Sequence, residues 1–174
     1  AHSIGSGSAG AGFTAPGMIA LPGSSSGIAS APRPERGPEA SPVNVLPTLW
    51  FRNAWSWWPK TPKPSLYRVN GVTGAAVLTA SLFELGEMYL YCEGSPGLLF
   101  TENETNTRRL WGTGEEGAFA KDAFHDCVIE GRAEAANPKG VGSKVAAHYV
   151  LTIPAGGTQT VHLRLLGGGE SPDQ

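Results

Sequence analysis

The chain has 174 residues, a formal net charge of -2 and a hydrophobic content of 40%, with a sequence pI near 6.1. This length and composition suffice for one ordinary domain with a hydrophobic core. The nearly balanced charge argues against nucleic acid and anionic membranes as partners. The sequence lacks the run of about 18 apolar residues that a membrane helix needs, so we expect a soluble protein.

The two ends of the sequence differ in composition from its middle. Residues 1–39 are dominated by Gly, Ser, Ala and Pro, which bury little apolar surface, and predict a flexible or extended arm. The polar, glycine-rich residues 167–174 predict a disordered tail. We therefore expect the folded domain over residues 40–166.

Between the arm and the tail, short apolar or alternating runs are separated by turn residues, which favours an all-β fold, an antiparallel β-sandwich. The expected strands are Val43–Trp57 with a break near Arg52, Leu66–Val69, Ala75–Ser81, Met88–Cys92, Leu98–Thr101, Phe124–Ile129, Lys144–Ile153 and Thr158–Leu165. The last two runs flank a Pro-Ala-Gly-Gly turn and predict a hairpin. Helical character is limited to residues 103–110 and 118–123, with a turn at 134–139.

Cys92 and Cys127 are the two cysteines of the chain. A disulfide between them would close a loop of about 35 residues and stabilise the fold by roughly 3 to 4 kcal/mol. The alternative is two reduced thiols buried in a sheet core, since free cysteine is among the most buried residue types. We favour the reduced thiols.

Three sequence blocks are distinctive in order, spacing and rare dipeptides. They are RGPEASPVNVLPTLWFRNAWSW at Arg36–Trp57, LGEMYLYCEGSPGLLFTENETNTRRLWG at Leu85–Gly112 and KDAFHDCVIEGRAEAANPKGVGSKVAAHYVLTIPAGGTQTVHLRL at Lys121–Leu165. Together they resemble the amino-terminal β-sandwich portion of bacterial family 63-type glycoside hydrolases, which are glucosidase-like. In that family the sandwich precedes an (α/α) toroid that supplies the paired catalytic carboxylates, and the substrates are α-linked glucosides or related sugars. The chain resembles such a fragment without the catalytic toroid.

Two groups of acidic residues are the candidates for glycoside hydrolysis, a reaction that needs a pair of carboxyl groups. Glu102 and Glu104 would share one face of an extended segment. Asp122 and Asp126 flank His125, and all three side chains would converge only on a helical turn. In both places the alternative is a structural polar network. We expect no metal and no cofactor.

Exposed aromatic side chains are the candidates for carbohydrate contact, because their faces stack on sugar rings. The expected set is Trp55, Trp57, Trp58 and Trp111, with Arg108 as a polar contact. The alternative places these tryptophans in the core, since Trp55 and Trp57 are spaced two apart like one packed face of a strand.

The expected function is a non-catalytic accessory module with a role in carbohydrate binding or assembly. A small stand-alone glycoside hydrolase is the alternative, and a self-associating structural protein is a third. An incomplete sandwich leaves strand edges unpaired, which predicts a homo-oligomer. Because the chain begins with Ala1, its location is open, and the resemblance slightly favours the bacterial cytoplasm.

Overall fold

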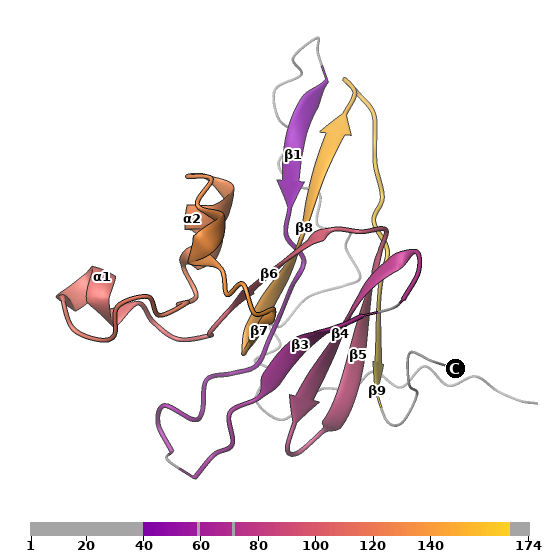
Figure 1. Ribbon diagram of the computed structural model, residues 1–174. Coiled ribbons are helices and arrows are strands. Elements are labelled where there is room, and N and C mark those ends of the chain that lie inside the picture. Colours follow the sequence, from indigo (N-terminus) through magenta and orange to yellow (C-terminus); the bar gives the residue numbers. More distant parts are fainter. Residues whose placement is uncertain (1–39, 59, 71, 168–174) are drawn as a thin grey trace, which may run out of the picture. The chain divides into compact units, whose positions relative to one another are not determined.

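The computed structural model describes residues 40–58, 60–70 and 72–167, and these are mostly β-structure (Figure 1). The predicted arm and residues 168–174 of the predicted tail lie outside the described residues. The strands are β1 (Ser41–Val45), β2 (Thr48–Trp50), β3 (Ser65–Val69), β4 (Ala75–Leu82), β5 (Gly86–Glu93), β6 (Gly97–Thr101), β7 (Val141–Gly142), β8 (Lys144–Ile153) and β9 (Leu163–Gly167). The helices are α1 (Thr107–Trp111), α2 (Ala123–Val128) and the short 3-10 helix η1 (Ala133–Ala135).

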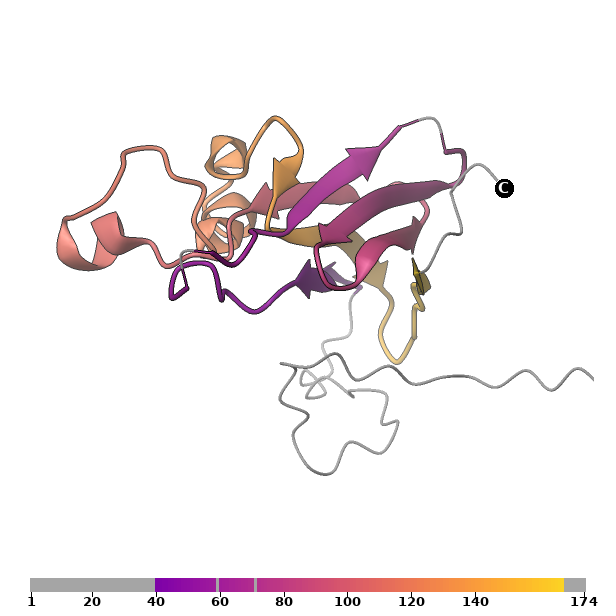
Figure 2. The same cartoon turned by 90° about the horizontal axis from the view of Figure 1, so that it is seen from below.

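The strands form two antiparallel sheets packed face to face (Figures 1 and 2). In the first sheet β8 is central, with β6 along one edge. β1 and β2 follow each other along the opposite edge, because Ala147 donates a backbone hydrogen bond of 2.9 Å to Pro47 between them. The second sheet has the order β7-β3-β4-β5-β9. The predicted all-β antiparallel sandwich is confirmed.

Side chains that alternate along the strands build the core between the sheets, as a strand period of two requires. Two adjoining clusters make it up, one of Leu66, Leu78, Ala80, Phe100 and Val145 and the other of Ala76, Cys92, Ala147 and Tyr149. The chain crosses between sheets at β7 and β8, where Gly142 and Ser143 are buried. No helix among the described residues is long and apolar enough to cross a membrane.

Both cysteines are free. Cys92 lies in the sheet core, and burial raises the pKa of its thiol to about 11. Cys127 is half-buried on α2 instead of in a sheet. The expectation of reduced thiols is thus confirmed, and its placement of Cys127 in a sheet is wrong.

The hairpin predicted around the Pro-Ala-Gly-Gly turn is wrong. The turn itself forms, since Gly157 donates a backbone hydrogen bond of 2.8 Å to Pro154. The strands on either side nevertheless belong to different sheets: β8 pairs with β1, β2 and β6, whereas β9 pairs with β5. Residues 158–162 carry the chain across, so β9 begins at Leu163 and not at Thr158.

Two further predicted strands differ from the structure. Residues 123–128 form helix α2, which buries Ala123 and Asp126 on one side, three residues apart as a helix places them. The run predicted over residues 43–57 has an additional break at Leu46 and Pro47. It leaves the strand after Trp50, next to the break predicted near Arg52, but residues 55–57 form a turn and the strand does not resume. Of the helical segments predicted over 103–110 and 118–123, only residues 107–110 lie in a helix, α1, and residue 123, where α2 begins.

Candidate functional site

Residues 51–58 and 60–64 connect β2 to β3 and are called here the tryptophan loop. Its backbone folds back on itself, because the amides of Trp57 and Trp58 both donate to the carbonyl of Ala54, at 3.1 and 3.0 Å. The side chain of Asn53 accepts a bond of 3.0 Å from the amide of Ser56. Such Asn-centred turns are local alternatives to strand pairing, which explains why the predicted strand ends here.

Two asparagines fasten this loop to the segment that follows β6. Asn53 Nδ2 donates to the carbonyl of Asn103 at 3.1 Å, and Asn103 Nδ2 donates to the carbonyl of Phe51 at 2.8 Å. The amide of Asn103 in turn donates to Ser143 Oγ at 2.9 Å. These reciprocal bonds fix residues 102–104 against the tryptophan loop.

The ammonium group of Lys63 joins the two predicted glutamates. Its Nζ lies 2.9 Å from Glu102 Oε2 and 2.9 Å from Glu104 Oε1. Trp55 Nε1 donates to the same Glu104 oxygen at 2.8 Å, and the lysine nitrogen lies 5.9 Å from the centre of the Trp55 ring. The buried hydroxyl of Ser143 donates to Glu102. The structure therefore brings Glu102 and Glu104 together, with one cation between them.

The pKa directions follow from these contacts. Burial raises the pKa of Glu104, but the hydrogen bonds from Lys63 and Trp55 and the charge of Lys63 outweigh it, so the pKa lies below its ordinary value. Burial lowers the pKa of Lys63, but bonds to both glutamates outweigh it and the pKa is raised. Glu104 is held ionised, which suits a hydrogen-bond acceptor better than a general acid.

The tip of the tryptophan loop presents large aromatic side chains to solvent. Trp57 is 77% exposed and Trp58 is 60% exposed. Trp55, by contrast, is half-buried against Glu104. The alternative prediction, in which Trp55 and Trp57 pack together on one buried strand face, is therefore wrong. The turn at 55–57 places the two rings in different environments.

A second polar cluster links α1 to α2. Arg109 Nη1 lies 3.2 Å from Asp122 Oδ2 and 3.2 Å from Asp126 Oδ1, and Arg132 Nη2 lies 3.0 Å from Asp126 Oδ2. Asn106 accepts the amide of Arg109 at 3.0 Å and donates to Asp122 at 3.2 Å, and so caps α1. The helical turn of α2 brings Asp122 and Asp126 to one arginine, whereas His125 is exposed and takes part in neither ion pair.

The expected sugar-contacting residues divide between the two clusters. Trp55, Trp57 and Trp58 belong to the tryptophan loop, whereas Trp111 and Arg108 lie on α1. Trp111 is 66% exposed. Arg108 forms an open ion pair of 3.4 Å with Glu116. In the described part of the chain, no group of three or more His, Cys, Asp or Glu side chains is placed to hold a metal ion.

Sequence reasoning missed two of the cations in these clusters, Lys63 and Arg132. Lys63 is 39 positions before Glu102 in the chain, and Arg132 follows Asp126 after a turn, so neither pairing has a local spacing signal. An available signal was Asn53, since Asn in an aromatic run marks a turn. Interpreted as a turn, Asn53 would have kept the strand from resuming after the predicted break near Arg52.

Comparison with known proteins gives one distant similarity. Neither a family model nor a solved structure matches the chain. An uncharacterized protein of the yeast Saccharomyces cerevisiae, YMR196W, is 25% identical over an alignment of 149 residues, and the match covers 72% of this chain. The chain spans 14% of the length of that yeast protein. It is a distant homologue of a segment of a much longer polypeptide.

Proposed function

We propose that the sandwich is a non-catalytic module that binds carbohydrate through the tryptophan loop, as an accessory domain of the family 63 glycoside hydrolase type. The observation that carries the proposal is the exposure of Trp57 and Trp58 beside the Lys63-centred cluster. Exposed tryptophan faces stack on sugar rings, and ionised carboxylates and ammonium groups bond sugar hydroxyls. The sequence resemblance favours α-linked glucosides as the sugar.

The rigidity of the loop supports this proposal. Binding by stacking gains most when the aromatic rings are held in place before the ligand arrives. Three hydrogen bonds, two between the loop and Asn103 and one from Trp55 to Glu104, hold the loop against the segment that follows β6. Trp57 and Trp58 therefore project from a fixed base.

The test measures the binding of maltooligosaccharides to the full chain by tryptophan fluorescence and calorimetry. Trp57→Ala and Trp58→Ala should each weaken binding by about tenfold, since one stacked ring contributes on the order of 1 kcal/mol or more. Trp111→Ala is the matched control, because Trp111 is equally exposed but lies on α1. Equal affinity in all three variants and the parent would refute the proposal.

A stand-alone glycoside hydrolase is the second candidate, favoured by the convergence of Glu102 and Glu104 on one nitrogen. Aryl glucosides are the substrates to offer. If Glu104→Gln and Asp122→Asn abolish a turnover that the parent chain shows, the accessory role is wrong and the hydrolase stands. Turnover absent from the parent, with sugar binding retained, supports the accessory role.

A further inference from the structure

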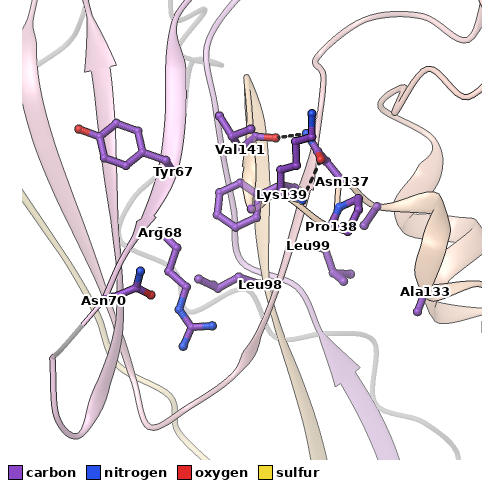
Figure 3. Close-up of a pocket in the computed structure, with 13 residues that line it drawn as sticks. Tyr67, Arg68, Asn70, Leu98, Leu99, Ala133, Asn137, Pro138, Lys139 and Val141 are labelled. Carbon is purple, nitrogen blue, oxygen red and sulfur yellow. Dashed lines mark hydrogen bonds between the residues drawn. The ribbon is translucent and has the colours of Figure 1, made fainter.

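A cavity of about 430 Å³ opens on the seam between the two sheets (Figure 3), and none of its lining residues belongs to either polar cluster. This volume is in the range of small-molecule sites. One wall comes from β3 and the residue after it, the floor from β6, and the other wall from residues 133–141. The residues that shape its chemistry are Arg68, Asn70, Leu98, Leu99, Asn137 and Lys139.

The wall opposite β3 is held rigidly by Asn137. Its amide donates to the carbonyl of Phe100 at 2.8 Å, and its Nδ2 donates to the carbonyl of Val141 at 2.7 Å. Its Oδ1 accepts the amide of Lys139 at 3.0 Å. Figure 3 shows this bonded turn facing the β3 side of the cavity. The cavity is thus shaped before any ligand enters.

The charge of the cavity is positive. Arg68 and Lys139 line it, and no Asp or Glu is among its lining residues. The three segments that supply most of the wall, residues 65–83, 94–101 and 135–151, contain no acidic residue. Within residues 40–58, 60–70 and 72–167, neither Arg68 nor Lys139 takes part in an ion pair. Glu134 lines the separate hollow beside Asp126.

The position of Arg68 follows from the topology. β7 pairs with only Leu66 and Tyr67 of β3, so Arg68 lies where that pairing ends. Figure 3 shows its side chain extending toward Leu98 and Asn70, whereas the Tyr67 ring points to the other side of the strand. The Arg68 guanidinium group therefore lies beside the amide of Asn70 and the apolar side chain of Leu98. Among the described residues, no carboxylate lines the cavity to neutralise its charge.

We propose that this cavity binds a small organic anion, with its phosphate or carboxylate group on Arg68 and its uncharged body against Leu98 and Leu99. A guanidinium group forms paired, charge-assisted hydrogen bonds with either anion. Lys139 adds positive potential from the opposite wall. The site and ligand class are separate from the tryptophan loop and its neutral sugar.

The test uses calorimetry on the full chain with glucose 6-phosphate, glucuronate, inorganic phosphate and neutral glucose as probes. At least one of the two sugar anions should bind through this cavity, weakening as salt is added, and glucose should not bind here. Tighter binding of glucose 6-phosphate than of glucuronate would assign a phosphoryl group, and the reverse order a carboxylate. Inorganic phosphate alone should bind more weakly than the preferred sugar anion, because it has no uncharged part to contact Leu98 and Leu99.

Arg68→Gln should weaken binding of the preferred anion by at least about tenfold, because charge-assisted bonds are lost. Arg164→Gln is the matched control, since Arg164 is an exposed arginine on β9 without a role in the cavity. Trp57→Ala should also leave anion binding unchanged, which separates this site from the proposed function. Equal loss in the Arg68 and Arg164 variants, or none in either, would overturn the proposal.

If the Arg68→Gln variant does not fold, an NMR titration of the unaltered chain still tests the proposal. Backbone NMR signals should shift on titration with the preferred anion at residues 68–70, 98–99 and 137–141. Shifts confined to other residues would contradict the assignment of the cavity. Failure of both sugar anions to bind would contradict it as well.

Discussion

Lys63 is the residue on which the first cluster depends, because two carboxylates share its ammonium group. Lys63→Met should lower the free energy of unfolding by about 1 kcal/mol at pH 7, since half-exposed ion pairs contribute little and the two glutamates then repel each other. Lys60→Met, in the same loop, should change stability much less. Chemical denaturation of both variants measures the difference, and equal losses would contradict this role of Lys63.

The pH dependence of that difference follows from the directions of the two pKa shifts. The folded pKa of Glu104 is below the ordinary 4.5, so its contribution is present above 4.5 and is lost as the pH falls through the folded pKa. The folded pKa of Lys63 is above the ordinary 10.5, so its contribution is lost as the pH rises through that folded value. The stability gap between parent and Lys63→Met should therefore close at acidic pH. A gap that widens on acidification would exclude this assignment.

Asp126 has the corresponding role in the second cluster. Its side chain is 12% exposed and lies against Arg109 and Arg132. Asp126→Asn should lower stability by about 2 kcal/mol, because charge-assisted bonds are lost at a largely buried site. Glu116→Gln is the control, since Glu116 is 85% exposed at the end of a loose pair and should have little effect. Thermal unfolding of both variants checks this, and equal midpoints would argue against it.

At the scale of elements, the transition from β7 to β8 depends on close backbone approach at Gly142. A Cβ at this position would overlap the carbonyl of Thr101. Gly142→Ala should therefore lower the free energy of unfolding by more than about 2 kcal/mol, because buried backbone must move. At Gly97 the nearest atoms to such a Cβ lie 4.0 Å away, so Gly97→Ala should stay within about 0.5 kcal/mol of the parent. Comparable unfolding midpoints for the two variants would show that the crossing tolerates a side chain.

At the scale of the whole molecule, the face of β9 that is directed toward the core is poorly covered. Leu163 and Leu165 pair with Cys92 and Leu90 and so face the core side, yet they are 37% and 52% exposed. In the described part of the chain, no strand pairs with the outer edge of β9. An uncovered apolar face beside an open edge predicts self-association.

Light scattering after size exclusion should show a dimer or larger assembly of the full chain. Replacing Leu163 and Leu165 together with Lys should shift it to monomer. Val150→Lys is the control, since Val150 is an equally apolar residue, 65% exposed, on β8. A parent chain that is monomeric at every concentration would contradict the prediction.

The sequence by itself determined the all-β sandwich and most strand positions, because alternation of apolar residues and turn residues are local signals. The sequence also identified two pairs of acidic candidates, Glu102 with Glu104 and Asp122 with Asp126. Only the tertiary structure decided which sheet each strand joins, as β8 and β9 show, because pairing depends on the packing of both faces rather than on the turn between neighbours. It likewise decided that Lys63 and Arg109 occupy the centres of the two acidic pairs and that Arg68 lies in an acid-free cavity. Such contacts join residues far apart in the chain, and no local spacing encodes them.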